Sequence, residues 1–315
     1  MKKLTLALLS GGISSEREVS LSSGEQVYGA LDKEKYAIIR YDPKTDLQRL
    51  VSDASKIDAA LIILHGPYGE DGTVQGLLDL LGIPYQGSGV IGSAIAMNKI
   101  ASKQLFEKVG LPTPPDVVVR RGDAVETDVW VERIGLPLVV KPVSNGSSVG
   151  VTIVDSKAGM ETALEKALAL DEEILVETFV EGIELTCGVI GNQVLEAFPV
   201  IEIVPDKEHA FFDYEAKYTP GVTQEICPAR IPDALTEQVQ TYAKMAHQAL
   251  FCKGYSRTDM ILKGQELFVL ETNTIPGMTA NSLLPQAAKA AGLSFGALLD
   301  RLIELGLECH QNKRS

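Results

Sequence analysis

Short apolar runs alternate with amphipathic helical stretches over the first hundred residues. The runs have the length and apolar content of buried strands and lie at residues 4–9, 36–41, 59–64 and 83–86. Strands and helices that alternate in this way predict βαβ units and a mostly parallel sheet. Ser15 followed by Glu18 predicts a capping box at the start of the first helix. The loop at 11–16 is therefore expected between a strand end and a helix start, where open α/β sheets bind small ligands.

The pattern changes after a long helix predicted over residues 90–109. Residues 111–115, Leu-Pro-Thr-Pro-Pro, form a stiff extended linker and a candidate domain boundary. Beyond this linker, β-branched runs separated by turns lie at residues 138–140, 151–154, 174–180 and 185–190. With one helix at 157–170, they predict a second unit, of antiparallel α+β type.

A third region follows, with its own strands and helices. Its predicted elements are strands at 194–204, 256–262 and 266–272, a helix at 233–251 and C-terminal helices at 282–309. The connection at 206–224 is rich in aromatic and charged residues. Long loops in compact proteins are usually functional or disordered. The aromatic residues favour a functional role, as a lid that covers a binding site.

The charge balance limits the kind of partner. The 315 residues carry 29 Lys and Arg against 42 Asp and Glu, a formal net charge of −13, which argues against nucleic acid or an anionic membrane surface. An anionic ligand therefore needs a local cationic pocket. The four cysteines show no metal-ligand spacing, and there is no stretch of 18 apolar residues, so we expect a soluble cytoplasmic protein with reduced thiols. The apolar run at 4–9 is too short for a signal peptide.

Residues 87–92 match the dinucleotide-binding pattern G-x-G-x-x-G. The acid that binds ribose in that motif lies at the tip of the following strand. Glu107, twenty residues beyond Gly87, instead falls near the end of the same predicted helix. We interpret this segment as a glycine-rich turn that enters a helix.

A loop of small residues between two β-branched strands is a candidate phosphate site. Lys141 ends the first strand, and residues 144–150, Ser-Asn-Gly-Ser-Ser-Val-Gly, precede the second. The backbone amides of such a loop can surround phosphate oxygens, while Lys141 supplies a fixed cation. It is not a Walker loop, because G-K-[ST] is absent and a strand follows. The alternative is a surface hairpin with a solvated lysine.

Two strands joined by a tight turn at residues 263–265 form a second candidate site. If the loop has three residues, so that Leu262 pairs with Glu266, alternation along the strands places four polar side chains on one face: Arg257, Asp259, Glu271 and Asn273. A two-residue loop would break this alignment. Oxygen ligands without His or Cys suit Mg²⁺. The alternative is an exposed cluster on a solvated sheet face.

The histidines are isolated in the sequence. His65, at the end of an apolar strand, fits ligand contact and structural capping of its loop equally well. His209, His247 and His310 have no carboxylate or cysteine company, so none is predicted to bind a metal.

Five motifs extend in order over essentially the whole chain. They are Gly11-Gly12 with 15–20, His65-Gly66 with 69–72, Lys141-Pro142 with 146–150, residues 214–218, and Glu271 with 273–274 and 276–279. Together they resemble the D-alanine:D-alanine ligase family of the ATP-grasp superfamily. The resemblance implies α/β and α+β folding in a three-domain ATP-grasp architecture. The expected parts are an N-terminal parallel α/β domain at 1–98, a central small domain at 99–181, and a C-terminal large domain at 182–315 with the lid loop at 206–224.

The resemblance also implies that ATP lies between the central and C-terminal domains. The implied ATP-binding residues are Lys99, Lys141, Ser148, Glu177, Phe179, Val180, Glu184, Phe211, Lys217 and Ile261. Two Mg²⁺ ions, or Mn²⁺, would be held by Asp259, Glu271 and Asn273.

In such ligases the carboxylate of one D-alanine attacks the γ-phosphoryl group of ATP, and the amine of a second D-alanine displaces phosphate from the acyl phosphate. The implied catalytic residues are Glu16, Ser147, Tyr218, Arg257 and Gly277. The implied substrate-binding residues are Glu16, His65, Arg257, Gly277, Ser282 and Leu283.

Three functions fit the motifs. The first is the dipeptide-forming reaction for peptidoglycan precursors, which Lys217-Tyr218 in the lid favours over D-lactate as acceptor. The second is the same chemistry with D-serine or D-lactate as second substrate, and the third is a non-catalytic nucleotide-binding regulator. A homodimer is expected from the resemblance alone.

Overall fold

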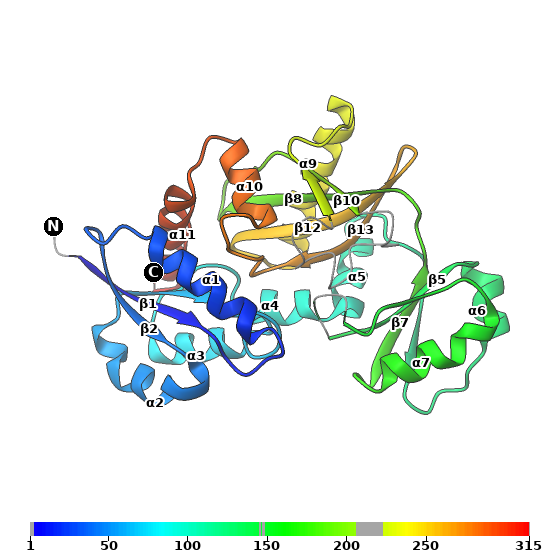
Figure 1. The fold of residues 1–315 in the computed structure, drawn as a ribbon, viewed down its shortest axis with the longest axis horizontal. Helices are drawn as coiled ribbons and strands as arrows, with labels where there is room; N and C mark the ends of the chain where they lie inside the picture. The colour runs from blue at the N-terminus through cyan, green and yellow to red at the C-terminus, as the bar shows by residue number, and fades with distance from the viewer. Residues whose placement is uncertain (1–2, 145, 147–148, 206–222, 315) are drawn as a thin grey trace.

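The computed structural model describes residues 3–144, 146, 149–205 and 223–314. Three sheets lie along the longest axis of the molecule. The C-terminal sheet, whose strands come last in the sequence, lies between the other two (Figure 1). Within this part of the chain, no helix combines the length and the apolar character that a bilayer span requires.

The N-terminal sheet is parallel, as predicted, with strand order β2-β1-β3. Its strands are β1 (Leu4–Ser10), β2 (Tyr36–Tyr41) and β3 (Ala59–Ile63). Helices α1 (Arg17–Ala30), α2 (Pro43–Asp53) and α3 (Thr73–Leu81), with a short 3₁₀ turn at Ala54–Lys56, connect and follow them. Every residue of β3 is buried, as expected for a parallel strand that is covered on both faces.

Two predictions for this region are wrong. Helix α1 begins at Arg17 with Glu16, not Ser15, in the N-cap position, and no side chain caps it. The amide of Glu16 donates to the Ser14 hydroxyl at 3.2 Å. The run at 83–86 makes only one bridge to the sheet. The Gln86 side chain bonds both backbone groups of Ile62, at 2.8 and 2.7 Å, and so takes the place of a strand there.

The helix predicted over residues 90–109 is two helices. Helix α4 (Val90–Met97) ends at Asn98, whose backbone is extended, and α5 (Lys99–Lys108) begins directly after it. The Asn98 side chain accepts a bond from the amide of Ala101 and thereby caps α5. The break re-aims the chain, so that Lys99 points toward the site described below.

The central sheet is antiparallel, with strand order β4-β7-β5-β6. Its strands are β4 (Asp116–Arg120), β5 (Leu138–Pro142), β6 (Thr152–Val154) and β7 (Glu173–Thr178). Helices α6 (Thr127–Ile134) and α7 (Met160–Leu168), the latter after a 3₁₀ turn at Lys157–Gly159, pack on it. The sequence pattern predicts the run at 185–190 in this unit, and this prediction is wrong. It belongs to β8 (Ile183–Gly191), which pairs with strands of the C-terminal sheet.

The C-terminal sheet has the strand order β11-β10-β8-β12-β13, with β9 beside β8. Its other strands are β9 (Glu196–Ala197), β10 (Ile201–Pro205), β11 (Thr223–Ile226), β12 (Gly254–Lys263) and β13 (Glu266–Asn273). The single strand predicted at 194–204 is divided into β9 and β10, because Pro199 has no amide hydrogen to continue a ladder. Helices α9 (Asp233–Ala249), α10 (Leu283–Ala290) and α11 (Phe295–Arg314) complete this part.

The hairpin of β12 and β13 has a two-residue loop, not the predicted three. Lys263 pairs with Glu266 around Gly264, whose φ is +64°, a backbone that glycine adopts readily in a tight hairpin turn. A bulge then adds Leu270 to β13, and Asp259 faces Glu271. Turn and bulge each change the register by one residue, so the polar side chains still share a face.

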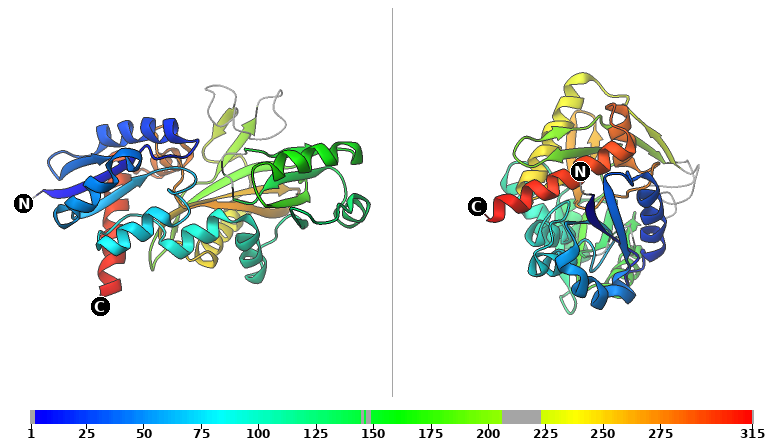
Figure 2. Two further views of the ribbon diagram at one scale, coloured as in Figure 1. Left: turned by 90° about the horizontal axis from the view of Figure 1, so that it is seen from below. Right: turned by 90° about the vertical axis from the view of Figure 1, so that its left-hand side faces the viewer.

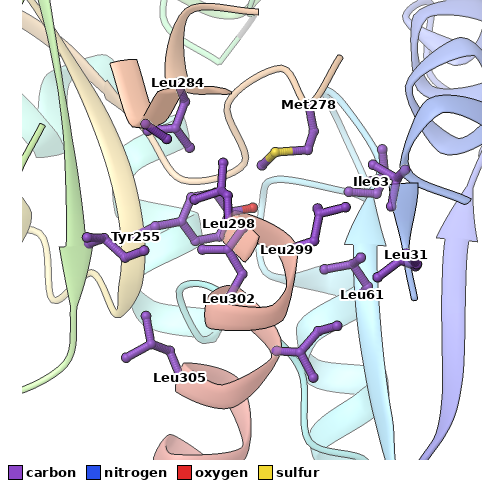
Figure 3. Close-up of a cluster of buried hydrophobic side chains, with 14 of the residues drawn as sticks. Leu31, Leu61, Ile63, Tyr255, Met278, Leu284, Leu298, Leu299, Leu302 and Leu305 are labelled. Carbon is purple, nitrogen blue, oxygen red and sulfur yellow. The ribbon is translucent and has the colours of Figure 1, made fainter. Parts of the chain in front are cut away.

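A shared hydrophobic core joins the first and last parts of the chain. Leu61 and Ile63 of β3 pack with Leu298 and Leu302 of α11, and Tyr255 of β12 lies on the other side of that helix (Figure 3). Figure 2 shows α11 beside the N-terminal sheet and far from the central sheet. The central sheet has a separate core.

Candidate active site

A pocket lies where the central sheet meets the C-terminal sheet. The predicted ATP and metal residues that line it are Lys99, Lys141, Glu177, Phe179, Val180, Glu184, Asp259, Ile261 and Glu271. They come from α5, from β5 and β7 of the central sheet with the residues that follow β7, and from three strands of the C-terminal sheet. Residues far apart in the sequence therefore meet in one pocket.

Apolar side chains from both sheets form a slot in this pocket. Val139, Val151 and Ile153 line it from the central sheet, and Ile261 and Leu270 from the C-terminal sheet. Of these, only Ile261 was predicted. Alternation of side chains between the two faces of the strands at 138–142 and 151–154 could have indicated Val139, Val151 and Ile153. The bulge that turns Leu270 toward the pocket has no marker in the sequence.

Two backbone amides at the inner edge of the slot are already paired within the protein. The amides of Thr178 and Phe179 donate to the carbonyls of Pro115 and Pro137, each at 2.9 Å. These two amides are not available to a ligand. A ligand at 177–180 would therefore have to bond other backbone groups of this segment.

Glu177 lies between two lysines. Its Oε1 accepts from Lys141, and its Oε2 accepts from Lys103 at 3.0 Å. Burial alone would raise the pKa of Glu177, but the charges and hydrogen bonds of Lys141 and Lys103 outweigh burial and lower it. The carboxylate is thus ionised at neutral pH. Sequence reasoning missed Lys103, which has no motif of its own.

The β12–β13 hairpin presents two carboxylates to the pocket. Asp259 and Glu271 are direct cross-strand partners. Arg257 holds Asp259 in a fork, with Nε–Oδ1 at 2.9 Å and Nη2–Oδ2 at 2.8 Å. Thr186 and Asn273 also donate to Asp259, at 2.5 and 3.1 Å. The predicted face of Arg257, Asp259, Glu271 and Asn273 is therefore present, and it is not a solvated surface cluster.

Lys99 lies opposite the hairpin. Its Nζ is 3.8 Å from Glu271 Oε2, with side chains 12% and 30% exposed. Its amide donates to the carbonyl of Val143 at 3.2 Å. The helix start is thereby anchored to the segment that follows β5, and a cation is held next to an acid that faces the pocket.

The donor atoms fit a hard divalent cation. Two carboxylates and one carboxamide provide oxygen ligands, which suit Mg²⁺. Over the residues that the structure describes, no group of three or more His, Cys, Asp and Glu side chains is placed to hold a metal. Phosphate and water oxygens would have to complete the coordination of any Mg²⁺ bound here.

The N-terminal loop approaches the same region. Glu16 is buried, and Cβ atoms added to Gly66 and Gly146 would lie 3.2 and 3.5 Å from its Oε1. The structure therefore brings Glu16 next to the glycine-rich loop after β5. Both glycines leave space around the carboxylate.

Glu70 is an acid that sequence reasoning did not select. Its Oε2 accepts from the amide of Gly66 at 2.6 Å. Burial, and next the charge of Glu16, raise the pKa of Glu70 to about 8, although the hydrogen bond from the Gly66 amide and then the charge of Arg257 act in the opposite direction. The motif at 69–72, which contains Glu70, was the feature of the sequence that could have identified it.

His65 is buried and bonds to the backbone of Ile275. Burial lowers the pKa of His65 to about 4, so the ring is neutral at pH 7. In the described part of the chain, its Nε2 has no hydrogen-bond partner. The carbonyl of His65 accepts from the Ser14 hydroxyl at 2.7 Å, which ties this loop to the N-terminal one.

Gly277 and Ser282 are neighbours at the start of α10. A Cβ on Gly277 would lie 3.1 Å from Ser282 Oγ, a contact tighter than ordinary packing. That hydroxyl bonds to the Thr279 amide and hydroxyl at 3.1 and 2.8 Å. Ser282 is the residue before the helix, and Leu283 is its first residue, so the free amides of a helix start lie here. The predicted residues Ser147, Ser148, Phe211, Lys217 and Tyr218 lie outside the described residues.

Comparison with known proteins identifies the family. Two family models match the chain, D-ala D-ala ligase C-terminus over residues 105–304 and D-ala D-ala ligase N-terminus over residues 42–88. A D-alanine–D-alanine ligase of Syntrophobacter fumaroxidans is 62% identical, and the match covers 98% of this chain and 99% of that protein. The chain belongs to the D-alanine–D-alanine ligase family. The predicted ligase class and ATP-grasp fold are confirmed.

Solved structures of D-alanine–D-alanine ligases share the fold over their full length. The structure from Bacillus anthracis complexed with ATP has a TM-score of 0.87 at 36% identity, and the match covers 98% of this chain and 99% of that one. The VanG D-Ala:D-Ser ligase from Enterococcus faecalis has a TM-score of 0.82 at 32% identity, over 97% and 100% of the two chains. A D-Ala:D-Ser ligase therefore shares the fold of this chain.

Proposed function

We propose that this member of the D-alanine–D-alanine ligase family joins two D-alanine molecules into D-alanyl-D-alanine for peptidoglycan precursors and converts ATP to ADP and phosphate. One observation carries the proposal. A single pocket combines an apolar slot with two lysines and a facing pair of carboxylates, in a chain that matches such ligases over nearly its whole length.

The positions of the apolar and cationic side chains in the pocket favour one orientation of ATP. The adenine occupies the slot between Val151 and Ile261, and Glu184, the sheet neighbour of Ile261, meets the ribose hydroxyls. Lys99 and Lys141 then offset phosphate charge. Since the chain carries a net charge of −13, these cations provide the local attraction that the whole molecule lacks.

Asp259, Glu271 and Asn273 would hold two Mg²⁺ ions, with Mn²⁺ as a substitute. Bound there, the cations would neutralise charge on the transferring phosphoryl group. Glu271 faces both Asp259 across the strands and Lys99 across the pocket. A carboxylate has two oxygens, and in this proposal Glu271 would share them between the two cations.

The reaction proceeds in two steps. A carboxylate oxygen of the first D-alanine attacks the γ-phosphorus, the bond to ADP breaks, and an acyl phosphate forms. The amine of the second D-alanine, after it loses a proton, attacks the acyl carbon, and phosphate leaves. Arg257 and the amide of Gly277 donate to the oxyanion of the tetrahedral intermediate.

Glu16 binds the ammonium group of the first D-alanine. Its carboxylate is buried beside Gly66 and Gly146, and a negative charge removed from water in this way favours a cationic ligand. A link from Glu16 through Ser147 to Tyr218, which would close the lid and exclude water, remains a prediction. Ser282 and the Leu283 amide would bind the second carboxylate at the start of α10.

The test is phosphate release from ATP and Mg²⁺ with different amino acids, combined with mass analysis of the product. Release that depends on D-alanine alone and yields D-alanyl-D-alanine supports the proposal. Release that requires D-serine or D-lactate as well supports the second candidate, which the VanG neighbour keeps open. Nucleotide binding without turnover would refute both.

A further inference from the structure

Two carboxylates occupy directly opposite positions on neighbouring strands of the central sheet. Asp116 of β4 pairs with Glu177 of β7, and like charges in that position repel each other. Lys103 of α5 lies over both, with Nζ 3.0 Å from Asp116 Oδ1 and 3.0 Å from Glu177 Oε2. The Lys103 side chain is only 8% exposed. One buried cation therefore serves two acids.

The arrangement continues through Glu177 to the nucleotide side. Glu177 Oε1 bonds Lys141, and both side chains line the ATP pocket. Lys103 does not line that pocket. It lines a separate depression with Asp116 on the far side of Glu177. The order from outside to inside is thus Asp116, Lys103, Glu177, Lys141.

The charges along this row explain what Lys103 contributes. If Lys141 were the sole counter-ion of Glu177, its departure toward a phosphate would leave a buried carboxylate uncompensated, which is strongly unfavourable. With Lys103 on the other oxygen, Glu177 stays compensated when Lys141 moves. We propose that Lys103 is a positioning residue for ATP, which holds Glu177 from behind and so lets Lys141 turn from Glu177 to the phosphates. This rests on the proposed binding of ATP in the pocket.

The decisive variant is the pair Lys103→Met with Asp116→Asn. It removes one cation and one anion together, so the net charge is unchanged and Lys141 becomes the counter-ion on which Glu177 depends. We expect the Kd for Mg-ATP, measured by calorimetry, and the KM for ATP to rise about tenfold, the factor equivalent to one pKa unit of interaction. The KM for D-alanine should change by less than about twofold.

Three single variants are matched controls. Asp116→Asn keeps Lys103 on Glu177 and should leave the Kd for Mg-ATP unchanged. Lys103→Arg retains the cation and should keep most of the affinity for Mg-ATP that the pair Lys103→Met with Asp116→Asn loses. Lys157→Met, which breaks an exposed ion pair with Asp128 in the same part of the chain, should have no effect on either constant.

A double-mutant cycle separates positioning from a structural role. In a Glu177→Gln background Lys141 has no carboxylate to leave, so the Lys103→Met change should no longer weaken Mg-ATP binding. An unchanged Kd in the decisive variant, or an equal loss in the Glu177→Gln background and in the wild-type background, overturns the proposal. Absence of D-alanine-dependent turnover in the wild type would instead refute the proposed function, while the calorimetric Kd still decides the role of Lys103.

Discussion

Arg257 can be tested for a direct role in catalysis by replacement with Met. The guanidinium holds Asp259 through bonds of 2.9 and 2.8 Å, with side chains 12% and 11% exposed. Methionine keeps much of the aliphatic volume and removes the charge. Thr186 and Asn273 still donate to Asp259, so we expect the free energy of unfolding to fall by less than the roughly 3–5 kcal/mol typical of a buried pair that loses a partner.

The expected catalytic loss is larger than the loss of stability. One donor to an oxyanion is worth a factor of about 10² to 10³ in kcat, or roughly 2.7–4 kcal/mol in the barrier. The assay is D-alanine-dependent phosphate release at saturating ATP and D-alanine, with the fraction of folded enzyme checked by circular dichroism. The KM for ATP should change little, because the donor acts in the second step.

Two variants test whether Arg257 acts directly or through Asp259. Thr186→Val removes another donor to Asp259 without touching substrate and should reduce kcat by less than about tenfold. Arg257→Lys keeps the charge but not the planar fork, so it should recover only part of the activity. If Arg257→Met retains kcat within about threefold of the wild type, or if Thr186→Val loses as much, the oxyanion role is refuted.

Three further outcomes are expected. Glu271→Gln should abolish turnover and leave the melting temperature within a few degrees of the wild type; near-normal turnover would contradict the bridging role. Burial tends to raise the pKa of Asp42, but the hydrogen bond from Arg17 and those from backbone amides dominate and lower it from 3.8 to about 2. Above pH 4, the free energy of unfolding of the wild type should therefore exceed that of Asp42→Asn by about 1–2 kcal/mol after allowance for solvent screening. Urea midpoints should show this difference falling by roughly half near pH 3, because the carboxylate becomes protonated. A difference that does not change with pH would contradict the lowered pKa of Asp42. Leu61→Ala, at a side chain with no exposure, should reduce the free energy of unfolding by about 3–5 kcal/mol, against less than about 0.5 kcal/mol for the exposed Leu80→Ala.

The sequence predicted the parts of the fold that depend on local pattern. The parallel N-terminal sheet follows from apolar runs that alternate with amphipathic helices, and the polar face of β12 and β13 follows from period-two alternation. The register did not follow, because a two-residue turn and a bulge at Leu270 compensate for each other. Neither feature alters the polar pattern from which the face was predicted.

Other features depend on contacts between distant residues. Gln86 replaces a strand by bonding Ile62, and no local rule distinguishes that side chain from a strand residue. Lys103 and Glu70 acquire their surroundings only when α5 meets β7 and when the loop after β3 meets Glu16. The motifs pointed to the pocket and to the hairpin carboxylates, whereas the surroundings of Lys103 and Glu70 depend on burial and on distant charges that no local pattern records.

The core shared by β1, β3 and α11 has a consequence for how the chain is made. Leu6, Leu8 and Leu61 find part of their packing partners in Leu298, Leu299 and Leu302, which leave the ribosome long after the strands that they cover. The N-terminal sheet therefore stays incompletely covered until α11 has been synthesised. A polypeptide that terminates before residue 295 would keep this apolar surface exposed, which marks it for chaperones and proteases, so only copies that contain α11 reach the folded pool.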